Sequence, residues 1–175
     1  MIFLETERLI LRNVKVEDAE TIFDYRNNAL CARYQRGQTK DLAGIYKLVQ
    51  SHAEDFINEQ ENCMLAVALK DTDELIGEIL LMPGENTFSY GYTFSYKHHR
   101  KGYAYEALST LTAFLHARWR EHEFICFTDR ENTPSMALLK KLGFTDRGYL
   151  PGRDSEVFGL YTTPETDAEI AALVQ

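Results

Sequence analysis

The chain has 175 residues with a formal net charge of −8 at pH 7, and 45% of its residues are hydrophobic. This length and composition predict one water-soluble globular domain over residues 1–175, and the acidity argues against nucleic acid as a partner. No apolar run is long enough to cross a membrane, and the three widely spaced cysteines form no metal or redox motif. We therefore expect a cytoplasmic protein without a bound metal, present as a monomer or a homodimer.

The first part of the chain predicts a strand followed by two helices. Residues 8–14 alternate between apolar and polar side chains, as in a half-buried strand. Residues 16–28 have apolar positions at helical spacing. We expect a second helix over residues 39–59, with one face made of Ile45, Leu48, Val49, His52 and Phe56. On that face we interpret His52 as a partly buried structural histidine rather than a catalytic one.

Three strands are predicted next, at residues 63–69, 75–82 and 88–96, and the short turns between them make them antiparallel neighbours. The third strand carries an aromatic residue at every second position, which is typical of a stripe that faces the core. Its other face has small residues, including Gly91. A glycine inside a strand indicates that another group approaches the backbone closely.

The remaining elements complete a mixed sheet. They are a helix, a strand, a short helix, two strands and a terminal helix, at residues 102–119, 124–128, 134–142, 145–150, 156–161 and 163–174. Because a helix separates the strands 88–96 and 124–128, these two strands should be parallel. Thr133 is the predicted cap of the short helix, and the two final strands predict a hairpin. The fold class is therefore α/β, a mixed sheet with helices on both faces.

The densest cluster of basic residues in this acidic chain lies at residues 97–101, immediately before Gly102 and the helix that it opens. The first N–H groups of a helix have no intrahelical partner and, with the macrodipole, attract anions. Gly102 permits a tight turn and a close approach to those amides, while Lys97, Arg100 and Lys101 add positive charge. The stretch predicts a phosphate or pyrophosphate site, or else a solvated basic loop. It is neither a Walker loop nor a dinucleotide fingerprint.

A second motif, "NTPSMALLKKLGF" from Asn132 to Phe144, gives this loop a context. Together the two motifs resemble the GNAT acyltransferase superfamily, whose pyrophosphate loop is framed here by His99, Gly102 and Ala104. Two further stretches, "ETERLILR" near the N-terminus and "GY" ahead of the loop, are similar to the branch related to ribosomal-protein N-terminal acetyltransferases.

Within the resemblance, which covers roughly residues 5–161, three positions depart from the family pattern. His99 stands where Gln or Arg is usual, and Arg100 stands where a second glycine is common. Because backbone amides carry much of the phosphate binding, we expect these two changes to adjust affinity rather than abolish it. Leu139 occupies the position of a tyrosine that protonates the departing thiolate in many members, so the usual acid is absent.

The resemblance implies a single N-acetyltransferase domain with a mostly antiparallel sheet, a central parallel pair, and acetyl-CoA as co-substrate. The pantetheine arm would lie in a V-shaped opening between the strands 88–96 and 124–128, where unpaired main-chain groups can bind its amides. No metal is required. The residues that we expect to bind acetyl-CoA are Tyr92, Phe94, Ser95, His99, Arg100, Lys101, Gly102, Tyr103, Ala104, Asn132 and Lys140.

The implied reaction is direct attack of a neutral primary amine on the thioester, without a covalent intermediate. A backbone N–H of the sheet can stabilise the charge that develops on the carbonyl oxygen. Ser135, in the first turn of the short helix, is the expected hydrogen-bond donor to the departing thiolate, unless it only caps that helix. Glu78 and Glu156 are candidate general bases, as is a chain of waters.

The acceptor side should be built by residues 27–41, with Tyr34 and Gln35 in its lining, although an ordinary solvent-exposed loop explains this segment equally well. A protein N-terminus, an aminoglycoside-like or polyamine substrate and an amino-acid derivative all remain open as the amine acceptor. Two other kinds of protein are compatible with the motifs. One is a non-catalytic acyl-CoA-binding regulatory module, which the missing tyrosine permits, and the other is a nucleotide-binding protein.

Overall fold

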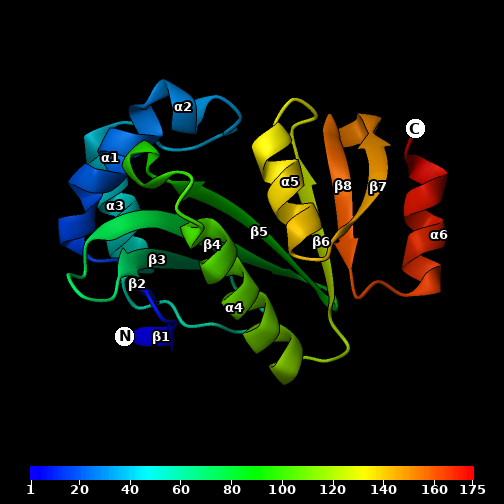
Figure 1. Cartoon of the computed structure of the whole chain (residues 1–175), viewed down its shortest axis with the longest axis horizontal. Coiled ribbons are helices and arrows are strands. Elements are labelled where there is room, and N and C mark those ends of the chain that lie inside the picture. Colours follow the sequence, from blue (N-terminus) through cyan, green and yellow to red (C-terminus); the bar gives the residue numbers. More distant parts are fainter.

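The computed structural model describes all 175 residues and places eight strands in one sheet (Figure 1). In chain order they are β1 (Ile2–Glu5), β2 (Leu9–Asn13), β3 (Cys63–Leu69), β4 (Leu75–Gly84), β5 (Thr87–Phe94), β6 (Glu123–Thr128), β7 (Thr145–Leu150) and β8 (Ser155–Leu160). Across the sheet the order is β1-β2-β3-β4-β5-β6-β8-β7. All neighbours are antiparallel except β5 and β6. The predicted sheet, mostly antiparallel with one central parallel pair, is confirmed.

The parallel strands β5 and β6 pair only where they begin. Thr87 is the partner of Glu123 and Phe88 is the partner of Phe124, and no later residues of the two strands pair with each other. On its other side, β5 stays in register with β4 as far as Phe94. The sheet therefore opens between β5 and β6 toward their carboxyl ends.

Helices cover both faces of the sheet (Figure 1). The helices are α1 (Ala19–Asn27), α2 (Ala29–Ala32), α3 (Leu42–His52), α4 (Tyr103–Arg118), α5 (Thr133–Lys141) and α6 (Pro164–Leu173). Along β3 the side chains alternate between two cores. Leu65 and Val67 pack with α4, whereas Met64 and Ala66 pack with α1 and α3. Because the two cores hold α1 and α3 on one face and α4 and α5 on the other, the opening between β5 and β6 has helices at both of its sides.

The helix predicted over residues 39–59 is shorter in the structure. It begins at Leu42 because the Asp41 side chain caps it, accepting from the Gly44 N–H at 2.7 Å. It ends at His52, whose Nδ1 lies 2.7 Å from Asp55 Oδ2, so His52 is the partly buried structural residue that was expected. Phe56, predicted on the buried face, lies beyond this end and is exposed.

Other differences concern the ends of elements. The strand predicted to reach Tyr96 stops at Phe94, because a 3₁₀ turn over Tyr96–His98 follows. β1 was not predicted, and it pairs with β2 at the edge of the sheet. All three cysteines are buried and free. None of the helices has the length and apolar character that crossing a membrane demands.

Candidate active site

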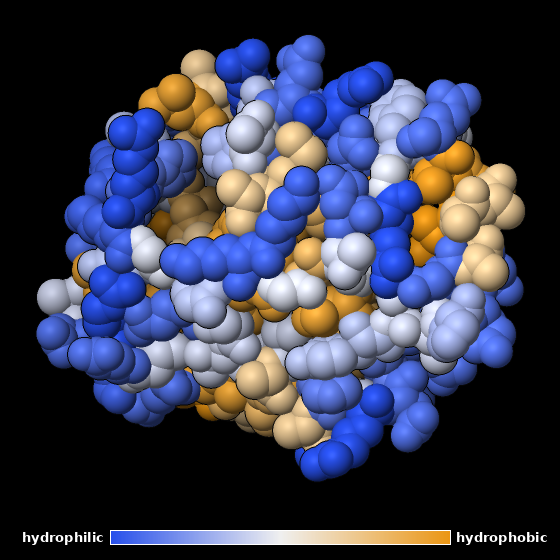
Figure 2. Space-filling view, turned by 45° about the vertical axis from the view of Figure 1, so that its right-hand side comes forward, coloured by the Kyte–Doolittle hydropathy of each residue, from blue (hydrophilic) through white to orange (hydrophobic).

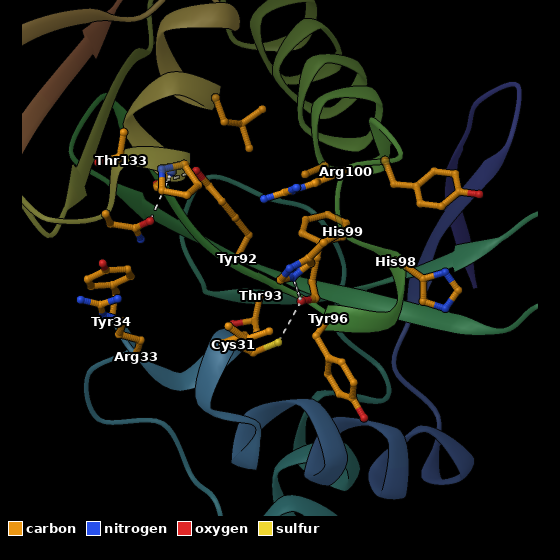
Figure 3. A pocket seen from close by; sticks show the side chains of 18 of the residues that line it. Cys31, Arg33, Tyr34, Tyr92, Thr93, Tyr96, His98, His99, Arg100 and Thr133 are labelled. Atoms are coloured by element: carbon orange, nitrogen blue, oxygen red, sulfur yellow. Dashed lines mark hydrogen bonds between the residues drawn. The ribbon is translucent and has the colours of Figure 1, made fainter.

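Because the sheet opens between β5 and β6, carbonyl groups of β5 have no partner from a neighbouring strand. They accept hydrogen bonds from side chains instead. Gln35 Nε2 donates to the Tyr92 carbonyl at 3.1 Å. The Phe94 carbonyl accepts from His99 Nε2 at 2.8 Å and from the Cys31 thiol at 3.3 Å (Figure 3). A carbonyl oxygen has two acceptor sites. Both are used at Phe94, but the Tyr92 carbonyl accepts one side-chain bond and has a second site for an amide of an extended ligand.

The basic loop after β5 presents the start of α4 to this opening. Gly102 is the residue before α4, with φ of +81°, and it provides no side-chain cap. Side chains cap α2, α3, α5 and α6, whereas α1 has no such cap and continues directly from a 3₁₀ turn over Val16–Asp18. The first-turn amides of α4 therefore have no side-chain acceptor, as an anion site requires. Arg100 also adopts a left-handed conformation, with φ of +62°, which explains why a glycine is usual at this position.

A charged contact that the sequence did not predict holds the start of α4 in place. Glu106 accepts from Thr6 Oγ1 at 2.5 Å and from Arg8 Nε at 2.7 Å, while Arg8 Nη1 donates to the Lys101 carbonyl at 3.0 Å. Burial opposes ionisation of Glu106, but these hydrogen bonds outweigh it and lower the pKa of the carboxyl group. The β1–β2 turn thus fixes both the loop and the first turn of α4.

A cavity of about 900 Å³ extends from this loop along β5 to the first turn of α5 and to α2. Figure 3 shows Arg100 and His99 on the loop side, Thr133 at the start of α5, and Arg33 and Tyr34 at the α2 side. The predicted acetyl-CoA residues that line it are Tyr92, Phe94, His99, Arg100, Gly102, Tyr103, Ala104 and Asn132. Tyr34 and Gln35, predicted for the acceptor side, line it as well.

Three residues predicted to bind acetyl-CoA lie outside this cavity. Ser95 is buried, and its N–H donates to the Ile76 carbonyl of β4. Lys101 is exposed and does not line the cavity. Lys140 pairs with Asp146 at 3.1 Å. The structure therefore does not bring these three side chains to the cavity.

Lys141 lines the cavity in place of Lys140 and lies 4.4 Å from the centre of the Tyr105 ring. Ser135, Leu138 and Lys141 all line it, and they recur at every third position of α5. Residues at this spacing share one face of a helix. This spacing was the signal in the sequence that distinguishes the two lysines.

Ser135 and Tyr92 meet at the start of α5. The Tyr92 hydroxyl lies 2.8 Å from Ser135 Oγ, and in Figure 3 the Tyr92 side chain points from β5 toward the first turn of α5. Asn132, not Thr133 as predicted, caps the helix, because its Oδ1 accepts from the Ser135 N–H at 3.3 Å. Ser135 does not supply the cap, so its hydroxyl group is available for another role.

A second cavity, of about 270 Å³, adjoins the first. The two share five lining residues, namely Tyr34, Gln35, Tyr92, Asn132 and Ser135. Arg36 crosses beside the second cavity, donating to Asp129 Oδ2 at 3.1 Å and to the Asp154 carbonyl at 2.8 Å. These bonds connect the segment after α2 to the loops that follow β6 and β7. The two cavities therefore meet at these five shared residues.

Glu78, a predicted base, lies in neither cavity. Its carboxylate is buried in β4 and accepts from Arg26 Nη2 at 2.6 Å and from the Tyr25 hydroxyl at 2.8 Å. Burial raises the pKa of Glu78, and the Arg26 and Tyr25 contacts offset this only in part. The arrangement is that of a structural ion pair between β4 and α1.

Glu156, the other predicted base, also lines neither cavity. Its neighbour Ser155 lines the second cavity, and successive side chains of a strand point to opposite faces. Leu139, at the position of the usual acid, is buried in the core with only 1% of its surface exposed. None of these three positions brings an acid or a base to the shared residues.

The surface of the protein is hollowed in one place on the face shown in Figure 2, where hydrophobic side chains lie below a rim of hydrophilic ones. The chain offers no cluster of three or more His, Cys, Asp or Glu side chains that could hold a metal ion. The groups around the cavities are thus helix amides, strand carbonyls, hydroxyl groups and cations. This set suits a phosphorylated ligand that also carries amide groups.

Comparisons with known proteins identify the family. Residues 8–145 match the family described as "Acetyltransferase (GNAT) domain". The chain is 30% identical over 157 residues to "Uncharacterized N-acetyltransferase p20" of Bacillus licheniformis, covering 87% of this chain and 86% of that protein. It is 26% identical over 151 residues to "Uncharacterized N-acetyltransferase YnaD" of Bacillus subtilis, covering 83% and 84% of the two chains.

Solved structures share the fold. A GNAT acetyltransferase from Bacillus anthracis superposes with a TM-score of 0.78 at 23% identity, over 91% of this chain and 98% of that one. The ribosomal L7/L12 alpha-N-protein acetyltransferase RimL, solved in complex with coenzyme A, superposes with a TM-score of 0.76 at 15% identity, over 91% and 97%. The family match over residues 8–145 and the p20 relative show that the chain belongs to the GNAT family and is an acetyltransferase.

Proposed function

We infer that this acetyltransferase moves the acetyl group of acetyl-CoA to a primary amine by direct attack. The observation that carries the inference is that two adjoining cavities share the five residues Tyr34, Gln35, Tyr92, Asn132 and Ser135. A two-substrate transfer without a covalent intermediate requires both reacting groups at one place. The larger cavity then holds acetyl-CoA and the smaller one admits the amine.

The larger cavity has the groups that a CoA ester requires. The first-turn amides of α4 at Tyr103 and Ala104, with Arg100 beside them, suit the pyrophosphate. The edge of β5 at Tyr92, whose carbonyl has an acceptor site left, suits an amide of pantetheine. RimL was solved with coenzyme A, and the acetyltransferase MccE, at a TM-score of 0.75, was solved with acetyl-CoA and AMP. Acetyl-CoA supplies the activated thioester of the reaction.

The residues at the junction position the reactants. The amine must arrive neutral, because an ammonium group has no lone pair for the attack. Ser135 is the hydroxyl group at the junction, and it donates a hydrogen bond to the sulfur as the thiolate departs. With Glu78 and Glu156 away from both cavities, we assign removal of the amine proton to water.

The acceptor amine is a protein N-terminus or a small-molecule amine. The relatives p20 and YnaD carry N-acetyltransferase in their names, and RimL is described as acting on the N-terminus of a ribosomal protein. These names make N-terminal peptides the first class of acceptor to test, followed by polyamines, aminoglycosides and amino-acid derivatives.

The test is release of the CoA thiol from acetyl-CoA in the presence of each amine, read with a thiol reagent. We expect one class to raise the release rate well above that without an amine, and mass spectrometry of the product to show one added acetyl group on nitrogen. If no amine in these classes accelerates release while acetyl-CoA binds, the proposed transfer is wrong. A product acetylated on oxygen would also contradict it.

A further inference from the structure

We propose that Tyr92 is a positioning residue that aims the Ser135 hydroxyl group at the departing thiolate. The inference rests on the proposed function, because it assigns the thioester sulfur to the junction of the two cavities. It deepens that function by naming what replaces the tyrosine that is missing at Leu139. Tyr92 comes from β5 and not from α5, so it reaches the same place from the other side of the opening.

The first support is the place where the two hydroxyl groups meet. Tyr92 Oη and Ser135 Oγ are 2.8 Å apart, and both residues line both cavities. Tyr34 is the other hydroxyl-bearing residue that lines both. The Tyr34 hydroxyl group bonds to no other residue, so Tyr92 and Ser135 are the two hydroxyl groups of the junction that a hydrogen bond joins.

The second support is that the Tyr92 ring has little freedom to move. It packs on the core, with its centre 6.5 Å from that of Tyr90 and 6.4 Å from that of Phe94. The other end of the pair is fixed as well, because the Ser135 N–H donates to Asn132 in the capped first turn of α5. Two rigid elements, β5 and α5, therefore determine the geometry of the pair.

The third support is the direction of the hydrogen bond. Either hydroxyl group can donate across this distance. Because a phenol is a stronger acid than an aliphatic alcohol, we assign the Tyr92 hydroxyl as the donor and Ser135 Oγ as the acceptor. This leaves the serine proton to point away from Tyr92, into the cavity. Burial raises the pKa of Tyr92, against a smaller opposing effect of the Ser135 hydrogen bond, so the phenol keeps its proton and remains a donor.

The step balances without any net change in Tyr92 or Ser135. The amine nitrogen forms a bond to the acetyl carbonyl carbon, the carbon–sulfur bond breaks, and its electron pair stays on sulfur. The Ser135 O–H donates a hydrogen bond to that thiolate while it accepts one from Tyr92. The proton that leaves the attacking nitrogen passes to water, and the thiolate takes a proton from water to give the CoA thiol.

Steady-state kinetics of Tyr92→Phe, Ser135→Ala and the double variant test the coupling. We expect each single change to lower kcat about tenfold with little change in the KM for acetyl-CoA, and the double change to lower kcat no further. Thr112→Val is the matched control. It removes a hydroxyl group that bonds a tyrosine of the same strand face, Tyr90, at 3.0 Å, and it lies outside both cavities. We expect its kcat to match that of the wild type.

A second measurement needs no acceptor. The pKa of the thiol of bound CoA is read from thiolate absorbance, with the complex of desulfo-CoA subtracted. Wild-type protein should hold this pKa below that of CoA in solution, and Tyr92→Phe should raise it as far as Ser135→Ala does. The positioning role would be wrong if the double variant lost the product of the two single losses in kcat, or if Tyr92→Phe left the thiol pKa unchanged. Neither result would contradict the proposed transfer.

The two hypotheses fail in different ways. Lowered thiol pKa in wild type, lost in Tyr92→Phe, supports the positioning role even if no amine is acetylated, in which case the proposed transfer is wrong. If CoA does not bind the protein, both are wrong. If Tyr92→Phe does not fold, as shown by its melting curve, Ser135→Ala with an unchanged thiol pKa is the outcome that overturns the pair.

Discussion

At the scale of single residues, Lys140 and Lys141 show how one helical step changes what a side chain contacts. Both are exposed at the end of α5, but Lys140 pairs with Asp146 whereas Lys141 lines the larger cavity. Consecutive helical residues point about 100° apart. Only Lys141 is therefore placed to attract the phosphates of a CoA ester.

We expect Lys141→Ala to raise the KM for acetyl-CoA about fivefold, the equivalent of roughly 1 kcal/mol for one exposed charge contact. Lys140→Ala is the matched control and should change the KM less than about twofold. Steady-state kinetics at low ionic strength measures both values. The Lys141 effect should shrink as salt is added, because salt screens exposed charges. An equal effect of the two changes would contradict the placement of Lys141.

Replacing Glu78 distinguishes a structural ion pair from a general base. Loss of a buried ion pair lowers the stability of the protein, whereas loss of a general base lowers kcat. Glu78→Gln leaves the Arg26 guanidinium buried without its carboxylate, and breaking such a pair costs about 3 kcal/mol or more. We expect urea unfolding to show this loss, with kcat of the folded protein retained. Glu156→Gln should change stability by less than about 0.5 kcal/mol. A Glu78→Gln protein of normal stability with kcat lowered about a hundredfold would make Glu78 the base.

At the scale of elements, the periodic patterns of the sequence predicted the central strands well and one helix less well. Strands β3, β4, β5 and β6 were predicted to within two residues, because each is a run of core-facing residues between clear turns. The helix over 39–59 was predicted too long, since residues after His52 are held by tertiary contacts, such as the Asn13 side chain on the Asp55 carbonyl. Apolar periodicity does not encode such a contact.

The same distinction holds in the candidate site. Arg100, Gly102 and Ala104 were predicted because they lie within one short stretch of the sequence. All three line the cavity. The contact between Arg8 and Glu106 joins residues 98 positions apart. Gln35 and the Tyr92 carbonyl are 57 positions apart. One sequence contains no signal for pairs this distant, so these contacts had to come from the structure.

The Arg8–Glu106 contact leads to a prediction about pH. The folded protein lowers the pKa of Glu106, so the folded state favours the ionised carboxylate. Its contribution to stability is fully present above the unfolded pKa of about 4.3 and is lost as pH falls through the lower folded pKa. The difference in unfolding free energy between wild type and Glu106→Gln should thus be largest near neutral pH and shrink in acid.

Urea unfolding of both proteins between neutral pH and about pH 3 measures this difference. Asp71→Asn is the control, because Asp71 is exposed in the turn before β4 and forms no ion pair. A Glu106 effect that stays constant across this range would mean that the carboxylate stabilises the protein through its shape rather than its charge.

At the scale of the whole molecule, the charge around the larger cavity is opposite in sign to the net charge of the chain. The chain carries a net charge of −8, but Arg33, Arg100 and Lys141 line the larger cavity, with Glu131 as its one acidic residue. A cavity with positive walls in an acidic protein raises the local concentration of anions while the remaining surface repels them. This distribution favours a polyanion such as a CoA ester over an amine as the occupant of the larger cavity.

Binding at that cavity should therefore stabilise the whole fold. Acetyl-CoA or CoA at 100 times its dissociation constant should add about 2.7 kcal/mol, which for a chain of this size raises the melting temperature by roughly 5–10 °C. Gly102→Val should lose this rise, since a branched side chain at φ of +81° stands before the first-turn amides of α4. Each protein is compared with and without ligand, so the strain that valine adds cancels. Equal rises in both proteins would remove Gly102 from the binding site, and a rise with ATP but not with CoA would make the cavity a nucleotide site.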